Sequence, residues 1–240
     1  MTDVSKSPQR IAGMFDAIAG RYDFLNHLLS AGIDRRWRRR AIRSLQLTGR
    51  ERVLDLCTGT GDLAIAAVRA RPPAARVVGV DFAGAMLRVG ERKLRGERLD
   101  GRIALVQGDA TRVPLGSASV DAVTIGFGIR NVEQMDVACA ELHRVLKPGG
   151  RLAILEFAVP TMPLFGAVYG WYVNRVLPRI GRVLSRNDSA YAYLPASIGA
   201  FASPDEFVKI LRQAGFGSIS PIPLMLGSVI LYTAQKGARS

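Results

Sequence analysis

The sequence contains little cysteine and histidine, and their scarcity excludes several kinds of site. Its two cysteines, Cys57 and Cys139, lie far apart and form no CxxC pattern, so neither a disulfide framework nor a thiolate zinc site is encoded. The two histidines, His27 and His143, cannot supply metal motifs that need two histidines on one helix. We therefore expect no transition metal and a reducing compartment.

The sequence also lacks a long apolar run that would serve as a signal or a membrane span. Its first ten residues are polar and have no apolar core, so we expect the protein to stay inside the cell. Two uncharged stretches, residues 157–174 and 213–235, are long enough to be tested as spans, but prolines and glycines interrupt both of them. Neither stretch is predicted to cross a membrane.

Acidic residues are outnumbered, since 20 Asp and Glu stand against 33 Lys and Arg, which gives a net charge of +13. This excess predicts attraction to a polyanion, either nucleic acid or an anionic membrane face. Six arginines surround Trp37: Arg35, Arg36, Arg38, Arg39, Arg40 and Arg43. Two interpretations stand side by side here, a solvated helix whose Trp37, Ala41 and Leu45 face the core, and a helix that contacts a membrane.

The order of apolar patterns predicts one α/β domain preceded by helices. Ile11, Met14, Phe15 and Ile18 have helical spacing, and we assign residues 1–50 to an N-terminal helical extension or lid. From residue 51 onward short apolar runs alternate with helical stretches, which is typical of a parallel sheet covered by helices. The predicted strands are residues 53–56, 77–80, 103–106, 122–125 and 152–155. A helix over 135–146, a capping box at 203–206 and a terminal hairpin at 216–222 and 228–234 complete the pattern.

The segment Val53–Ala64 runs from a strand through a glycine turn into a helix. Gly59 and Gly61 are needed there because a ligand that touches the backbone leaves no room for a Cβ. Asp81 follows the second strand, where a carboxylate accepts both hydroxyls of a ribose. The spacing therefore predicts a nucleoside ligand.

Two features of this segment favour S-adenosylmethionine over a dinucleotide. Ala64 stands where a dinucleotide fingerprint usually has its third glycine, although alanine also occurs there. Asp55 would repel a pyrophosphate but attract a sulfonium or ammonium cation; alternatively, it only hydrogen-bonds the loop backbone. Asp109, after the third strand, is placed to accept an adenine amino group or is a plain turn aspartate.

Several segments together closely resemble the ubiquinone/menaquinone biosynthesis C-methyltransferase family, over nearly the whole chain. They are residues 15–23 with Asn26, and residues 55–62, 79–82, 125–131, 141–150, 155–157 and 191–198. Phe127-Gly-Ile-Arg-Asn131 and Tyr193-Leu-Pro-x-Ser-Ile198 are the most specific of these motifs.

The resemblance implies a single-domain, Rossmann-like class I methyltransferase that uses S-adenosylmethionine and releases S-adenosylhomocysteine. It implies a seven-stranded, mostly parallel sheet with an antiparallel last strand over residues 51–240, with a substrate- or membrane-facing insertion at about 157–202. Gly126 replaces a serine of some relatives, which removes one side-chain hydrogen bond to the cofactor. The candidate cofactor residues are Asp55, Gly59, Thr60, Gly61, Asp81, Phe82, Asp109, Ala110 and Gly126.

A ring carbon of a quinol becomes a good nucleophile only when a ring hydroxyl loses its proton, so a base or a water network is required. Arg130 and Asn131 follow the fourth strand, where an open α/β sheet has its substrate cleft. Our hypothesis is that Arg130 stabilises the quinolate and holds water, Asn131 orients that water and Tyr22 assists. The alternative for Arg130 is an ion pair with a nearby Asp or Glu.

The expected activity is methyl transfer to a ring carbon of a prenylated quinol, with demethylmenaquinol as the favoured acceptor. We expect a cytoplasmic protein in peripheral contact with the anionic inner face of the membrane, no nucleic-acid partner, and leave a homodimer open. Three rival functions remain: an RNA methyltransferase, a non-catalytic adenosine-binding subunit of a quinone-synthesis complex, and an NAD oxidoreductase.

Overall fold

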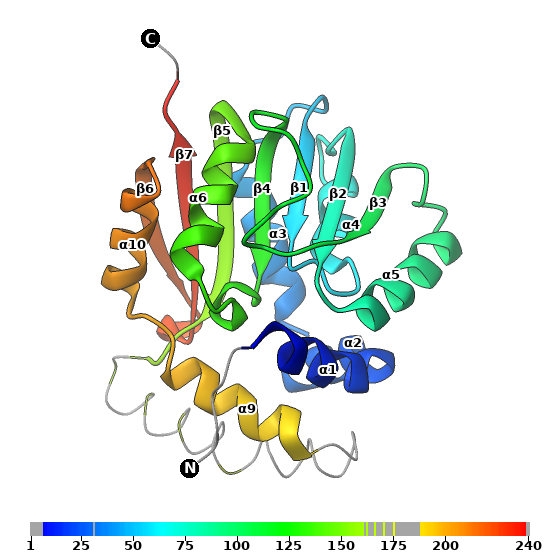
Figure 1. Cartoon of the computed structure of the whole chain (residues 1–240), viewed down its shortest axis with the longest axis vertical. Coiled ribbons are helices and arrows are strands. Elements are labelled where there is room, and N and C mark those ends of the chain that lie inside the picture. Colours follow the sequence, from blue (N-terminus) through cyan, green and yellow to red (C-terminus); the bar gives the residue numbers. More distant parts are fainter. Residues whose placement is uncertain are drawn as a thin grey trace.

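A computed structural model describes residues 7–30, 32–160, 162, 166, 170, 175 and 188–238. Seven strands form one sheet in the order β3-β2-β1-β4-β5-β7-β6 (Figure 1). The strands are β1 (Arg52–Leu56), β2 (Arg76–Asp81), β3 (Ile103–Gln107), β4 (Val120–Gly126), β5 (Leu146–Phe157), β6 (Phe216–Leu224) and β7 (Val229–Lys236). The helices are α1 (Pro8–Ile18), η1 (Ala19–Arg21), α2 (Tyr22–Leu29), α3 (Asp34–Ser44), α4 (Asp62–Val68), α5 (Gly84–Gly96), η2 (Ile129–Asn131), α6 (Met135–Val145), α9 (Asp188–Gly199), α10 (Pro204–Gln213) and η4 (Met225–Gly227).

The sheet separates two apolar cores because successive residues of a strand point to opposite faces. Leu54 and Leu56 pack with α6 and α10 on one face, and Val53 packs with α3, α4 and α5 on the other. Figure 1 shows α6 and α10 in front of the sheet and α3 and α4 behind it. Burial on both faces explains why the predicted strands are continuous apolar runs rather than alternating ones.

The predicted elements are confirmed, with one difference in length. β1 to β5 are parallel, and β7 pairs antiparallel with both β5 and β6, which confirms the terminal hairpin and the antiparallel last strand. β5 begins at Leu146, earlier than the predicted residue 152, because Leu146 already pairs with Val120 of β4. The register then shifts, and the next pair is Ala122 with Arg151. The capping box of α10 is present, since Ser203 and Glu206 bond each other's backbone N–H.

The described N-terminal residues are helical, and they lie at the carboxyl ends of the strands. α1 and α2 sit below β1 and β2, beside α9 (Figure 1). Ala41 and Leu45 of α3 are buried, and Trp37 packs against the same core, which confirms the inward face of this helix. Among the described residues no helix is both long and apolar enough to span a bilayer. Most of the predicted insertion at about 157–202 lies outside the described residues.

Candidate active site

A cavity of about 270 Å³ lies at the carboxyl ends of β1, β2 and β4 and is closed below by α1 and Tyr22. This edge is where ligands bind to open α/β sheets. The lining includes Tyr22, Gly59, Asp81, Phe82, Asp109, Ala110, Gly126 and Asn131. Four other residues predicted from the sequence lie outside the lining: Asp55, Thr60, Gly61 and Arg130.

The glycine loop between β1 and α4 takes its shape from left-handed backbone. Gly59 and Gly61 have φ of 58° and 86°, and Cys57 has φ of 54°. Gly61 is the N-cap of α4, and its N–H donates to the Thr58 carbonyl at 2.9 Å. The Gly59 N–H donates to Asp81 Oδ2 at 2.7 Å. The loop is therefore held against the end of β2, with Gly59 facing the cavity.

Asp55 is buried beneath the loop and accepts three hydrogen bonds. Its donors are Thr58 Oγ1 at 2.6 Å, Thr124 Oγ1 at 2.8 Å and the Ala64 N–H at 3.1 Å. Burial raises the pKa of Asp55 to about 6, although these hydrogen bonds oppose the rise. The geometry matches the alternative left open by the sequence, a carboxylate that holds the loop together. Direct contact between Asp55 and a cation stays a prediction.

Asp81 combines a structural role with an open face toward the cavity. Its Oδ2 accepts from Gly59, and its Oδ1 accepts the Ala83 N–H at 2.9 Å. Burial raises the pKa of Asp81. A carboxylate oxygen has two lone pairs, so both oxygens retain capacity for a ligand hydroxyl. Phe82, which is 38% exposed, lines the cavity next to it.

Asp109 and Gly126 mark the other walls of the cavity. Asp109 Oδ1 accepts from both the N–H and the hydroxyl of Thr111 at 2.8 Å, so this residue does shape a turn while it also lines the cavity. A Cβ on Gly126 would lie 2.7 Å from Leu63 Cδ1. A serine at this position would therefore require Leu63 to move, which accounts for the glycine.

Thr60 is bonded to the N-terminal helices rather than directed at the cavity. Its hydroxyl donates to Asp23 Oδ1 of α2 at 2.5 Å. Lys93 Nζ of α5 donates to Asp23 Oδ2 at 2.7 Å and also to Asp62. The predicted cofactor contact of Thr60 stays a prediction, and the sequence had not indicated Asp23 or Lys93 as its neighbours. These bonds tie α2, the glycine loop and α5 together.

Arg38 extends the same network into α3. Its guanidinium pairs with Asp34 at 2.5 Å and with Asp62 at 2.8 Å. His27 Nδ1 lies 2.8 Å from Asp34 Oδ2. In the described part of the chain, His27, Asp34 and Asp62 form the one group with the spacing of metal ligands. Arg38 pairs with both carboxylates and Lys93 pairs with Asp62 as well, so this group is part of an ion-pair network of the helices.

Arg130 is buried, 4% exposed, behind the cavity wall. Its NH1 donates to Glu156 Oε1 of β5 at 2.7 Å and to the Phe127 carbonyl, and its Nε donates to Ser197 Oγ of α9 at 3.2 Å. This is the ion pair of the alternative interpretation. Sequence reasoning did not identify Glu156 as the partner, although it belongs to the Leu155-Glu-Phe157 motif.

Asn131 and Tyr22 meet the cavity directly. Asn131 is 9% exposed, and its Oδ1 has no hydrogen-bond partner among the described residues. A buried acceptor without a partner in the protein is a place for a donor on a bound water or on a ligand. Burial raises the pKa of Tyr22, against the effect of a hydrogen bond to Asn26. Tyr22 is therefore a neutral phenol at neutral pH, able to donate a hydrogen bond.

Sequence reasoning assigned no ligand role to several lining residues. Ile11, Ala12 and Phe15 of α1 line the cavity, and Phe15 packs edge-on against Tyr22 at 5.9 Å. The helical spacing of α1 indicated an apolar face but could not show what it faces. Cys57 also lines the cavity, and burial raises the pKa of its thiol well above the usual range, which favours the protonated thiol.

This arrangement defines a class I methyltransferase that depends on S-adenosylmethionine: a sheet with one antiparallel strand, a glycine loop after β1 and an acid after β2. A solved S-adenosylmethionine-dependent methyltransferase from Aquifex aeolicus shares the fold, with a TM-score of 0.57 and 18% identity, over 77% of this chain and 81% of that one. At that identity the likeness concerns the fold alone.

The chain belongs to the ubiE/COQ5 methyltransferase family, whose model matches residues 1–236. It is 44% identical over 236 residues to the ubiquinone/menaquinone biosynthesis C-methyltransferase UbiE of a Geobacter species, covering 98% of this chain and 100% of the relative. It is 48% identical over 203 residues to a demethylmenaquinone methyltransferase of Thermus thermophilus, covering 85% and 91%. The resemblance noted from the sequence is confirmed.

Proposed function

We propose that the protein transfers a methyl group from S-adenosylmethionine to a ring carbon of a prenylated quinol, with demethylmenaquinol as the preferred acceptor. The observation that carries the proposal is a cavity lined by the glycine loop, Asp81 and Asn131, whose buried Oδ1 has no hydrogen-bond partner among the described residues. Family membership and the names of the relatives support the same reaction.

The cofactor side of the cavity has the groups that a nucleoside requires. Gly59 allows close backbone approach, Asp81 offers carboxylate oxygens to ribose hydroxyls, and Asp109 and Ala110 form the wall for an adenine. When bound, S-adenosylmethionine supplies an electrophilic methyl group on a sulfonium. The protein contributes mainly alignment and the exclusion of water, which for well-oriented reactants lowers a barrier by roughly 7–11 kcal/mol.

The acceptor side is proposed to lie at Asn131 and Tyr22. Asn131 Oδ1 accepts a hydrogen bond from the ring hydroxyl or from the water that takes its proton, and Tyr22 donates to the opposite oxygen. Arg130 acts through its charge from behind the wall, since Glu156 and the Phe127 carbonyl fix its guanidinium. The pair keeps Asn131 in place at the end of η2.

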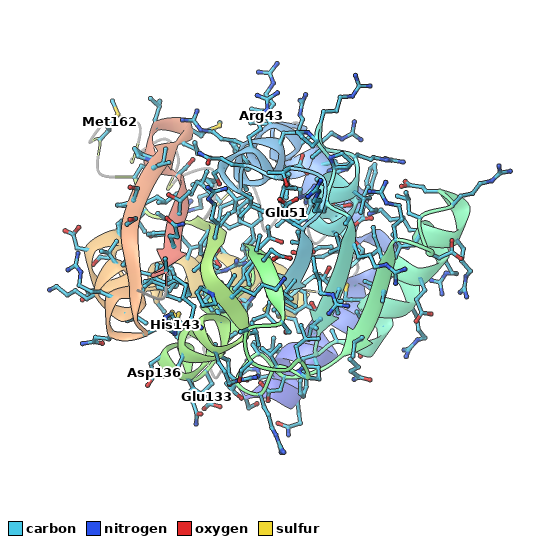
Figure 2. The ribbon with its side chains drawn as sticks, turned by 90° about the horizontal axis from the view of Figure 1, so that it is seen from above. Arg43, Glu51, Glu133, Asp136, His143 and Met162 are labelled. Atoms are coloured by element: carbon cyan, nitrogen blue, oxygen red, sulfur yellow. The ribbon has the colours of Figure 1, made fainter. Side chains whose placement is uncertain are left out.

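The protein is further proposed to contact the anionic inner face of a membrane from the cytoplasm. Arg38 of α3 is buried, whereas the other five arginines of this helix are exposed. The exposed ones are Arg35, Arg36, Arg39, Arg40 and Arg43. Figure 2 shows Arg43 on one side of the molecule and Glu133 and Asp136 on the opposite side. A charge separated in this way favours one orientation on an anionic surface.

The decisive experiment supplies the purified protein with methyl-labelled S-adenosylmethionine and each reduced acceptor in turn, a prenylated naphthoquinol and a prenylated benzoquinol. We expect labelled product from the naphthoquinol first, identified by mass as a ring C-methyl compound. Label in RNA instead would support a different class of methyltransferase. Cofactor binding without transfer to either acceptor would support a non-catalytic subunit.

A further inference from the structure

The turn between β6 and β7 displays large apolar side chains to solvent. Met225 is 46% exposed and Leu226 is 58% exposed, and nearby Val159 and Met162 are 64% and 50% exposed. These four residues, called the apolar edge below, follow the carboxyl end of β5 or precede β7. The apolar edge therefore lies at the same edge of the sheet as the cavity.

The backbone of this turn is unfavourable for the residues it contains. Met225 and Leu226 have φ of 45° and 55°, in the left-handed region that disfavours residues with a Cβ. Their exposed side chains gain little from packing within the chain. Strained backbone of this kind is found where function requires a side chain in a set place.

Contacts join the two halves of the apolar edge. The Ala158 N–H donates to the Ser228 carbonyl at 3.0 Å, and Ser228 Oγ donates to the Met225 carbonyl at 2.9 Å. A Cβ on Gly227 would lie 4.0 Å from Pro160 Cα. Figure 2 places Met162 beside the end of this hairpin. The segment after β5 and the turn before β7 thus lie side by side.

An apolar path connects the cavity with the apolar edge. Phe127 lines the cavity and stacks on Phe157, with ring centroids 4.4 Å apart. Phe157 is paired with Val229, the first residue of β7. Only Ser228 separates Val229 from the turn at Met225–Gly227. A hydrocarbon chain attached to a ring in the cavity would pass these aromatic rings on its way to the apolar edge, and the Arg130 guanidinium, paired with Glu156, lies 5.4 Å from the Phe157 ring along this path.

Positive charge lies next to this surface. α3 packs against β5 and β7, which carry the two ends of the apolar edge, and its arginines face solvent. Trp37 of α3 packs against Phe127, whose ring stacks on Phe157, so the N-terminal half of α3, with exposed Arg35 and Arg36, lies toward this surface. Arg43 lies toward the amino end of β5, where Arg151 donates to the Leu45 carbonyl. Apolar side chains flanked by arginines complement a leaflet with anionic head groups.

We propose that the apolar edge inserts into the head-group boundary of an anionic leaflet, with Met225 and Leu226 as its tip and the α3 arginines on the lipid phosphates. The inference rests on the proposed function in one respect, since a prenylated acceptor has to leave the bilayer to be methylated. Its tail would then remain on the Phe127–Phe157 path while the ring enters the cavity.

The test uses the full chain with Met225→Asn and Leu226→Asn combined, because asparagine tolerates left-handed backbone and removes the apolar surface. Val137→Ser on α6 is the matched control, since Val137 is also exposed but lies next to Asp136. Flotation with vesicles of phosphatidylglycerol and phosphatidylcholine should show at least about a tenfold loss of binding for the double variant and none for the control. The melting temperature of the double variant should equal or exceed that of the parent.

Turnover separates this proposal from the proposed function. The double variant should keep its kcat with a short-chain, water-soluble quinol and show a raised KM for a long-chain quinol presented in vesicles. Unchanged vesicle binding would overturn the inference and leave methyl transfer untouched. A parent dimer that the double variant converts to monomers, with vesicle binding intact, would also overturn it and make the apolar edge a contact between copies.

Discussion

The buried carboxylate of Asp55 holds the glycine loop above it through hydrogen bonds. It bonds Thr58, Thr124 and the Ala64 N–H, and so links β1, β4 and α4. Its ionised form is nevertheless disfavoured by burial, which raises the pKa from 3.8 to about 6. A raised pKa in the folded protein means that the native state binds the proton more tightly than the unfolded chain does.

Stability should therefore fall as pH rises through this window. The contribution of protonated Asp55 is complete below pH 3.8 and is lost as pH passes 6, a difference of about 3 kcal/mol. Asp55→Asn has no such titration. The difference in the free energy of urea unfolding between the two proteins should change by about that amount between pH 4 and pH 7. Parallel pH curves would contradict the burial argument.

Arg130 and Glu156 are both buried, so removing one side chain leaves the other as an unpaired buried charge. Arg130→Met and Glu156→Leu should each cost roughly 3–5 kcal/mol, and the double variant much less than the sum. Denaturant unfolding of all four proteins gives the coupling. If Arg130 also stabilises the quinolate, turnover stays low in the double variant although stability returns. Recovered turnover would reduce Arg130 to a structural residue.

Asn131 carries the strongest sign of a ligand, an acceptor with no partner among the described residues. Asn131→Leu has similar volume and removes that acceptor, so the fold should lose little stability. We expect kcat to fall by about 10²-fold with little change in cofactor affinity. Turnover assays and calorimetry with S-adenosylhomocysteine check the two parts. A parallel loss of both would place Asn131 on the cofactor side.

At the scale of elements, the N-terminal helices are bonded to α5 and to the start of α4. Asp16 of α1 accepts the Ala85 N–H at the start of α5 at 2.8 Å, and Lys93 of α5 bridges Asp23 and Asp62. The first of these bonds satisfies an N–H that a helix N-terminus leaves without an intrahelical partner. α1 and α2 are thus parts of the cavity wall.

Lys93→Met should weaken binding of S-adenosylmethionine and its product, because Asp23 then loses the partner that holds it against Thr60. We expect about a tenfold loss of affinity by calorimetry, corresponding to roughly 1.4 kcal/mol. Lys147→Met is the control, since Lys147 has an exposed ion pair with Asp121 away from the cavity. Equal affinities for both variants and the parent would show that the bridge is irrelevant to the pocket.

Helices and strands could be predicted from the sequence where a local pattern of residues defines them. The strands, the helix over residues 135–145 and the capping box of α10 follow from runs, periods and caps within a few neighbouring residues. The partners of the site residues were not predictable in this way. Glu156 lies 26 residues from Arg130 and Asp23 lies 37 from Thr60, so only the folded chain brings them together.

For the whole molecule, the net charge of +13 matters through its position. Exposed Arg43 of α3 lies on the opposite side of the molecule from Glu133 and from Asp136 of α6 (Figure 2). An exposed charge pattern of this kind acts over about 8–10 Å at physiological salt, so it orients the protein only close to a surface. The arginines and the apolar edge would then act on the same leaflet.

Arg39→Gln and Arg43→Gln together should weaken binding to anionic vesicles about tenfold or more, at roughly 1 kcal/mol for each arginine. Binding of the parent should also fall as salt rises, whereas the double variant should show a shallower salt dependence. Flotation at two salt concentrations measures both effects. Absence of parent binding to anionic vesicles at low salt would contradict the proposed membrane contact.

The cavity at the carboxyl ends of β1, β2 and β4 is proposed to hold the methyl donor beside a quinol ring. The most direct measurement follows labelled methyl groups from S-adenosylmethionine into reduced prenylated acceptors, with the parent and Asn131→Leu side by side. We expect a ring C-methyl product from the parent and about a hundredfold less from the variant. Equal product from both proteins, or none from the parent with either acceptor, would contradict it.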